Sequence, residues 1–403
     1  LAVVITELVA LRWIVAVVAG PTGPTGPTAR RAAPWLVLGA AVVLAVNPWA
    51  YETIAFDFHF EPFAALFCMA VGYCLWAGQI RRLRWLVPLA LACHVLAGTY
   101  LVGIGLSGML AGRRTRRPGA VIAMVGLVWF VVFSTLGASG DDGHYVGASY
   151  GYLAGPHHGR VGVFDVVAGV LRHPGAALHV AGSHWSVVVI FLVIVGMIGV
   201  VSPWGFGMAL VVLGPNVLDG SGIFIRFATA FQSWPAMPFL VVGSVMMVLR
   251  LLEHGPAARR IVIVAVAVWA ALLGEIAVVA LPSIPRDWLS VDAAAAAVLT
   301  RVQAMVPPDA EVISTGAVIG RFAERRSIYN FETAGETFRV DRGEVVFIFT
   351  PHEVLDDALP PRAADAAVAF VSHRLGARVL GSAAGVDAFA WTPPPGTTRV
   401  RLP

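Results

Sequence analysis

Long uncharged apolar runs dominate the first 282 residues of the chain, and they constrain its fold more than any other feature. A helix of about 20 apolar residues crosses the hydrocarbon core of a bilayer. The hydrophobic fraction is 58% and only 13% of the residues are charged, whereas a soluble domain carries about 25% charged residues. This composition excludes a soluble globular protein, a disordered chain and a nucleic-acid-binding protein. It predicts a polytopic membrane protein.

Six apolar runs have the length of single membrane-spanning helices: 2–19, 33–50, 62–80, 119–138, 236–252 and 261–281. Two longer runs, 85–112 and 186–218, read as hairpins of two short helices. Arginine clusters flank both ends of the first run. If both clusters are cytoplasmic, the chain crosses the membrane and returns within this run, and we place the turn at Gly98–Thr99. We place the second at Ser202–Pro203, because proline ends a helix. The expected fold is mainly α, a polytopic transmembrane helical bundle of about ten crossings.

The distribution of arginine predicts which loops face the cytoplasm. Four loops, 20–32, 81–84, 113–118 and 250–260, hold 12 of the 16 arginines in residues 1–282 and one acid. The opposite loops, 51–61, 139–185 and 219–235, hold three arginines and seven acids. Basic residues are retained on the cytoplasmic side. We therefore predict a multi-pass protein of the cell membrane whose acidic loops lie outside the cytoplasm.

Residues 283–403 have a different composition, with 12 arginines and 14 acids. We therefore divide the chain into a transmembrane domain, 1–282, and an extracytoplasmic α/β domain, 283–403. Within the second domain we expect helices at 293–305 and 363–375. Short strands are expected at 311–314, 327–331, 345–349, 378–380 and 388–391. The tail contains no Gly-rich phosphate loop.

Three ionisable residues alternate in the loop 51–61: Asp57, His59 and Glu61. In an extended segment, alternate side chains point to the same side. Two carboxylates and an imidazole could work as acid and base, and Asp57 and Glu61 could hold a divalent metal ion. The alternative is a solvated polar loop. Inside the first span, Glu7 and Arg12 could pair.

The loop 139–185 contributes a second group of candidates. Tyr150 and Tyr152 lie near acids and glycines, a combination that suits a sugar or a lipid headgroup. Arg160, Arg172 and Arg226 are the only arginines of the outer loops, and a lipid phosphate would need such a cation. The alternative for each arginine is snorkelling at the interface. The segment 163–171 predicts a short amphipathic helix lying on the membrane.

Several short motifs resemble one bacterial family of multi-pass membrane proteins, a domain of unknown function. The stretch Phe56-Asp57-Phe58-His59-Phe60-Glu61 resembles its Phe-Asp-Phe-His-Pro-Glu signature, and 150–153 with 173–174 resembles its next outer loop. Ser202-Pro203-Trp204 resembles its hairpin, and 305–310 the entry to its tail. Members resemble GT-C-type glycosyltransferases, which transfer a sugar from a polyprenyl-phosphate donor on the outer face of the membrane.

This resemblance implies a site made of residues from the outer loops. Asp57, Glu61 and His59 would be catalytic. Arg226, Arg160, Tyr150 and Tyr152 would bind the substrate. The expected partners are membrane lipid and the polyprenyl-phosphate sugar donor, with no nucleic acid.

The chain also departs from the family pattern. Phe60 replaces the proline of the signature, and Leu96-Ala97-Gly98 stands where a charged Lys-Glu-Asp motif is expected. Leu1 is not Met, and we expect that an upstream span and its acid-bearing outer loop are missing. One possibility is therefore that the chain is a truncated or inactive member of the family. Two alternatives remain: a membrane transporter or lipid flippase, and a non-catalytic membrane assembly protein.

Overall fold

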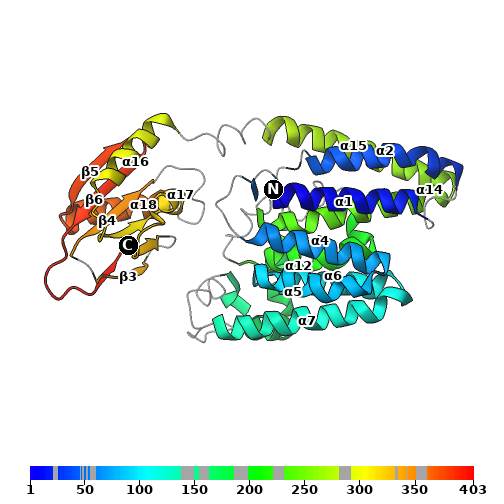
Figure 1. Ribbon diagram of the computed structural model, residues 1–403, viewed down its shortest axis with the longest axis horizontal. Helices are drawn as coiled ribbons and strands as arrows, with labels where there is room; N and C mark the ends of the chain where they lie inside the picture. Colours follow the sequence, from blue (N-terminus) through cyan, green and yellow to red (C-terminus); the bar gives the residue numbers. More distant parts are fainter. Residues whose placement is uncertain are drawn as a thin grey trace. The chain divides into compact units, whose positions relative to one another are not determined.

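A computed structural model describes residues 1–20, 26–45, 47, 50, 53–54, 60–137, 149–153, 163–185, 198–220, 231–280, 292–331, 335–341, 343–350 and 361–403. The chain divides into two compact units, unit 1 (residues 1–282) and unit 2 (residues 283–403). In the described residues, unit 1 consists of helices and unit 2 is built on a sheet (Figure 1).

The six single apolar runs of unit 1 each form one helix. They are α1 (Ala2–Ala19), α2 (Pro27–Ala45), α4 (Glu61–Ala77), α7 (Arg113–Gly137), α14 (Met237–Glu253) and α15 (Pro256–Ala280). Four helical stretches in the described part are long and apolar enough to cross a membrane, namely 2–19, 27–45, 113–134 and 234–253. The total of ten crossings stays a prediction.

The run 85–112 is broken into two helices, but not at the expected place. It forms α5 (Ile80–Cys93) and α6 (Ala97–Ala111), so the break lies at His94–Leu96 and the turn predicted at Gly98–Thr99 was wrong. Gly98 lies inside α6, where a Cβ would be 2.9 Å from the Gly126 carbonyl oxygen of α7. This glycine permits close helix packing and does not make a turn.

The break at Ser202–Pro203 is confirmed. Ser202 is extended, and Pro203 begins α12 (Pro203–Val217), preceded by the 3₁₀ turn η1 (Ile198–Val201). Proline suits the first helical position because its missing N–H would have no intrahelical partner there. The first half of this predicted hairpin, 186–197, lies outside the described residues.

Small residues let α6 pack closely on two neighbours. On one side, a Cβ on Gly105 would lie 2.5 Å from the Gly119 carbonyl oxygen of α7. On the other, a Cβ on Gly207 of α12 would lie 2.1 Å from the Gly103 carbonyl oxygen. Such contacts are typical of membrane helices, which associate through close packing because lipid supplies no hydrophobic drive between them.

An aromatic cluster joins four helices at the centre of unit 1. Trp13 of α1 is fully buried. Its ring lies 5.3 Å from that of Trp204 in α12, 6.0 Å from that of Phe239 in α14, and 6.3 Å from that of Tyr73 in α4. The same tryptophan therefore fixes the relative depth of these helices.

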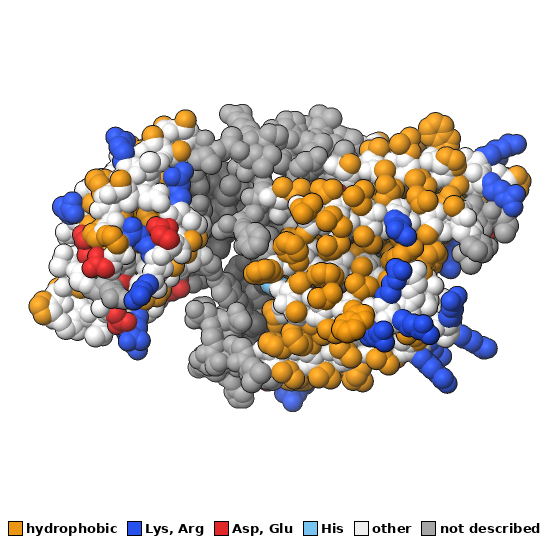
Figure 2. Space-filling view, in the orientation of Figure 1, with side chains coloured by type: hydrophobic (Ala, Val, Ile, Leu, Met, Phe, Trp, Pro, Cys, Tyr) orange, Lys and Arg blue, Asp and Glu red, His pale blue; other side chains and the backbone are white. Residues whose placement is uncertain are grey.

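The arginine-rich turns gather at one end of unit 1. A Cβ on Gly78, after α4, would lie 2.3 Å from an Arg114 nitrogen at the start of α7. A Cβ on Gly26, before α2, would lie 3.9 Å from the Glu253 side chain at the end of α14. Figure 2 shows arginine side chains gathered at this end of unit 1 and apolar side chains over the body of the unit. We call it the arginine end.

Unit 2 contains a mixed five-stranded sheet in the order β2-β1-β4-β6-β5. The strands are β1 (Glu311–Ser314), β2 (Ile328–Asn330), β4 (Val345–Phe349), β5 (Arg378–Ala383) and β6 (Val386–Trp391). β1 pairs in parallel with β2 and β4, and the β4–β6 and β6–β5 pairs are antiparallel. The bounds of β1 and β4 are those predicted.

Helices cover both faces of this sheet. α16 (Ala293–Met305), with the predicted bounds, packs against one face through Val298 and Leu299, close to Val346 and Ala388. α18 (Pro361–Ala369), which continues as a π-helical turn to Arg374, packs against the other. A short ladder of β3 (Thr337–Arg339) and β7 (Arg399–Arg401) lies outside the expected strands and adds Phe338 and Val400 to that second core.

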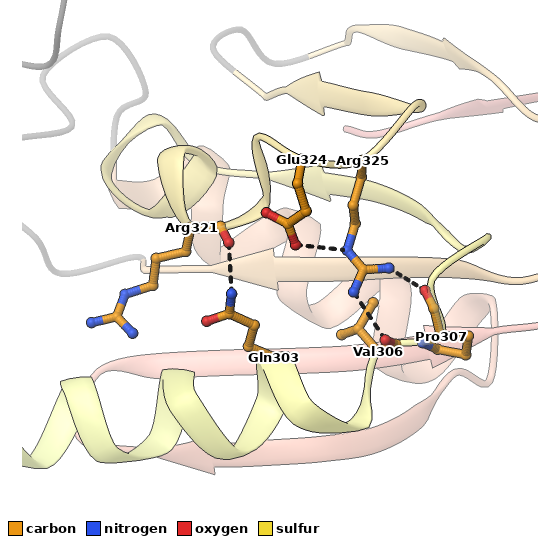
Figure 3. Close-up of polar contacts among 6 residues, drawn as sticks. All are labelled: Gln303, Val306, Pro307, Arg321, Glu324 and Arg325. Atoms are coloured by element: carbon orange, nitrogen blue, oxygen red, sulfur yellow. Dashed lines mark hydrogen bonds and ion pairs between the residues drawn. The ribbon is translucent and has the colours of Figure 1, made fainter.

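The end of α16 is held by one arginine (Figure 3). The Arg325 guanidinium donates to the carbonyl oxygens of Val306, at 3.0 Å, and Pro307, and it lies over the Phe322 ring. Gln303 also donates to the Arg321 carbonyl oxygen at 2.9 Å. Val306 is the C-cap of α16, where a carbonyl has no intrahelical donor, and Arg325 supplies one. The motif at 305–310 is thus a clamped helix end.

Candidate functional site

Glu61 is the catalytic candidate of the first loop that the structure describes. It is the first residue of α4, followed by Pro62. Only 4% of its surface is exposed, and its carboxylate Oε1 accepts a hydrogen bond from the Tyr100 hydroxyl. A buried charge is costly unless it is hydrogen-bonded. The start of a helix also favours an acidic side chain, so two features hold this carboxylate in place.

The break between α5 and α6 places Tyr100. His94 has an extended backbone, and its ring Nδ1 accepts a hydrogen bond from the Leu96 backbone N–H at 3.2 Å. The next helix then begins at Ala97, which brings the Tyr100 ring into the core with 3% exposure. Sequence reasoning missed Tyr100, although an isolated tyrosine within an apolar run is a signal that its hydroxyl needs a partner.

The second candidate loop forms a different cluster, at the end of α12. The Tyr150 hydroxyl donates to the Pro215 carbonyl oxygen at 3.1 Å, and the Tyr152 hydroxyl donates to that of Leu218 at 3.0 Å. The Gly220 N–H donates to the Ser149 carbonyl oxygen at 2.7 Å. Both tyrosines therefore bind main-chain oxygens at the end of a helix, where such partners are needed.

A histidine and an aspartate complete this second cluster. His184 Nδ1 lies 3.0 Å from the Val217 carbonyl oxygen, so this ring nitrogen carries the proton. Asp219 is fully buried. Burial, and to a lesser extent the negative charge of Asp219, raise the pKa of both Tyr150 and Tyr152. Both phenols consequently stay protonated and remain donors.

The two clusters lie at the same end of unit 1. Ser107 of α6 donates to the Trp204 carbonyl oxygen at 3.3 Å, while Gly103 meets Gly207. α12 therefore runs opposite to α6, and its last turn lies near the first turn of α6, which holds Tyr100. Since α6 ends at the arginine end, both clusters lie at the opposite end. Contacts with α12 thus bring the segment 149–153 to the same end as Glu61.

The remaining candidates are distributed as follows. Asp57, His59, Arg160 and Arg226 lie outside the described residues. Among the residues that are described, no group of three His, Cys, Asp or Glu side chains could hold a metal ion. Glu7 accepts a hydrogen bond from Trp234, and the Arg12 guanidinium lies 5.9 Å from the Tyr73 ring centroid. Among the described residues no ion pair joins Glu7 and Arg12, and one Glu7 carboxylate oxygen is buried without a hydrogen bond, so the pairing considered for this span is not formed.

The fold and sequence together define a helical membrane protein with a small α/β unit. The family described as "Predicted membrane protein (DUF2079)" matches residues 27–365. The chain therefore belongs to this family of predicted membrane proteins, whose function is unknown. Comparisons with curated proteins and with solved structures gave no match.

Proposed function

We propose that this protein is a GT-C-type glycosyltransferase that transfers a sugar from a polyprenyl-phosphate donor at the outer face of the cell membrane. The observation that carries the proposal is the buried Glu61–Tyr100 pair. It fixes a carboxylate at the end of the bundle remote from the arginine end, two residues after His59 and four after Asp57. An ionisable group within a membrane bundle is costly and is commonly retained for function.

The proposed reaction is an inverting displacement. Asp57 takes the proton of the acceptor hydroxyl, whose oxygen attacks the anomeric carbon of the donor sugar. The bond between that carbon and the phosphate oxygen breaks, and its electron pair leaves with the polyprenyl phosphate. Arg226 or Arg160 stabilises the charge of this leaving group. Glu61, held by Tyr100 at the start of α4, supplies the second carboxylate of the proposed site.

The carboxylates of Asp57 and Glu61 are the oxygen ligands that divalent metal ions prefer. These two residues would hold such an ion, and it would supply positive charge beside the departing phosphate. The roles of Asp57 as base and of the arginines as phosphate ligands do not depend on it. Tyr150 and Tyr152 would contribute aromatic surface to the sugar, with their hydroxyls anchored on α12.

The release of polyprenyl phosphate tests this function without knowledge of the sugar. The full chain would be reconstituted in vesicles with a panel of polyprenyl-phosphate sugars and an acceptor mixture. We expect release with one donor class, and Asp57→Asn should abolish it. Asp165→Asn, which removes an exposed acid of α9 (Val163–Arg172), is the matched control. Absence of release with every donor, or full release by Asp57→Asn, would contradict the proposal.

A lipid flippase is the second candidate, because the two broken apolar runs pack directly on each other. Gly103 of α6 meets Gly207 of α12, and each helix begins at a break. Discontinuous helices in contact occur in transporters, where they line the substrate site. Movement of a fluorescent polyprenyl-phosphate lipid between leaflets, without bond cleavage, would favour this function over the transferase.

A further inference from the structure

Helix α9 presents three distinct faces. Gly169 is buried, and a Cβ there would lie 2.3 Å from the Leu153 carbonyl oxygen, so this side packs on the segment 149–153. Asp165 and Arg172, seven residues apart, lie on a second side. Phe164, Val167 and Leu171 lie on the third. The spacing follows from about 100° of rotation per residue. All three residues of the third side are exposed, and Leu171 reaches 77%.

The next helix extends this apolar surface. α10 (Pro174–Ser183) begins directly after His173, and it buries only Ala177. Leu178 on α10 is 72% exposed, and Trp185 just beyond its end is 66% exposed. Two short helices and the residue after them thus leave five large apolar side chains exposed, and exposed apolar patches commonly mark a protein or membrane contact. We call Phe164, Val167, Leu171, Leu178 and Trp185 the elbow surface.

We propose that the elbow surface inserts into the lipid interface of the membrane at the end of unit 1 opposite the arginine end. The occupant is lipid because α9 belongs to a unit whose helices already expose apolar side chains over their whole body (Figure 2). Through Leu153 and the tyrosines, α9 is tied to the last turn of α12, which lies at that end.

The chemistry of the surface fits an interface and not the bilayer centre. An amphipathic helix lies in the headgroup region with its apolar side towards the acyl chains. Tryptophan is enriched at this depth, which suits Trp185. Asp165 and Arg172 share the remaining side, so both charges stay in water while the Arg172 guanidinium can reach a lipid phosphate. This inference rests on membership of a membrane family and is independent of the transferase.

Spin-label accessibility in the full chain tests the proposal. Single cysteines would replace Phe164, Val167, Leu171 and Leu178 in a background with the three native cysteines changed to alanine. Because these positions are exposed, the label displaces no packed side chain. References are Leu127 of α7 for lipid, Thr300 of α16 for water and Asp165 for the polar side of the same helix. The protein would be reconstituted in phosphatidylethanolamine–phosphatidylglycerol vesicles.

We expect the ratio of oxygen to nickel-chelate accessibility at the four sites to exceed that at Asp165 and Thr300 several-fold and to approach that at Leu127. Equal nickel accessibility at Leu171 and Asp165 would overturn the proposal, because the surface would then lie in water. Low accessibility to both reagents would also overturn it, because a protein would then cover the surface. As a second measurement, tryptophan fluorescence would be recorded in vesicles with brominated lipids, which quench nearby tryptophans. The quenching should be smaller in Trp185→Phe than in the unchanged protein, because Trp185 lies among the lipids.

Discussion

The Tyr100 hydroxyl donates a hydrogen bond to the carboxylate of Glu61, and both side chains are almost completely buried. The pair joins the first turn of α4 to the first turn of α6. It therefore links the segment that carries Asp57 and His59 to the helix that follows the His94 break. In the proposed reaction Tyr100 holds the Glu61 carboxylate in place, so Tyr100 acts through Glu61.

Removal of the hydroxyl by Tyr100→Phe should lower the free energy of unfolding by about 1–3 kcal/mol, because a buried acceptor loses the Tyr100 donor. Tyr73→Phe is the matched control, since the Tyr73 ring contacts Trp13 and Arg12 through its face and edge. Thermal unfolding can be followed through the exposure of the buried Cys68. Equal stability of the two variants would contradict the importance of the bond.

Two glycines of α12 should respond oppositely to the same substitution. Gly207→Ala puts a methyl group 2.1 Å from the Gly103 carbonyl oxygen, and overpacking of this kind costs about 1–3 kcal/mol. Nothing lies within 4 Å of a Cβ on Gly214. Gly214→Ala should therefore be neutral or stabilise the helix by up to about 1 kcal/mol. Unfolding in detergent measures both, and destabilisation by Gly214→Ala alone would refute the packing argument.

In unit 2, Arg325→Ala should destabilise the end of α16. The change removes the Arg325 donor from the Val306 carbonyl oxygen and leaves that of Pro307 with the Ala310 N–H, at a cost of about 1–3 kcal/mol. Arg321→Ala is the control, because the Arg321 side chain makes only a long, exposed hydrogen bond to Thr300. Hydrogen exchange in the full chain should speed up at the end of α16 for Arg325→Ala only. Equal exchange rates in the two variants would show that Arg325 does not stabilise the end of α16.

Tyr150 and Tyr152 should make the stability of the folded protein depend on pH in the alkaline range. Their pKa values are raised by burial, so the folded state holds both protons when the unfolded chain loses them. Their contribution to stability is present below the unfolded pKa of about 10 and is lost as the pH rises through the folded values. The double variant Tyr150→Phe, Tyr152→Phe should therefore lose less stability above that pH. Ultraviolet absorbance of phenolate measures the titration of the two tyrosines. Ionisation of both at the ordinary tyrosine pKa of about 10 would contradict the prediction.

The sidedness of the loops can be tested with single cysteines at exposed positions. Ser183 lies near the end of the loop 139–185, Thr300 lies in unit 2, and Ala257 lies in the arginine-rich turn 250–260. We expect an impermeant thiol reagent added to intact cells to label Ser183→Cys and Thr300→Cys, because arginines are retained in the cytoplasm. Ala257→Cys should react only after permeabilisation. The reverse pattern would invert the topology.

The sequence determined which apolar segments of unit 1 form its long helices, and it gave the bounds of some elements closely. The runs 2–19 and 236–252 became α1 and α14 with at most one residue of difference. In unit 2, the expected helix 293–305 and the strands 311–314 and 345–349 have the observed bounds. Hydropathy and local pattern suffice for these elements, because a helix in lipid requires a long apolar run and a buried strand requires a short one bounded by turn residues.

The tertiary structure decided which residues meet. Gly98 is as compatible with a turn as with a close contact, and only the approach of α7 makes it a contact. The strands β3 and β7 bury one residue each, Phe338 and Val400, which is too short a pattern to detect. The Glu61–Tyr100 bond spans 39 positions, and no local signal connects its two ends. Such contacts arise because packing selects one partner among many that the sequence allows.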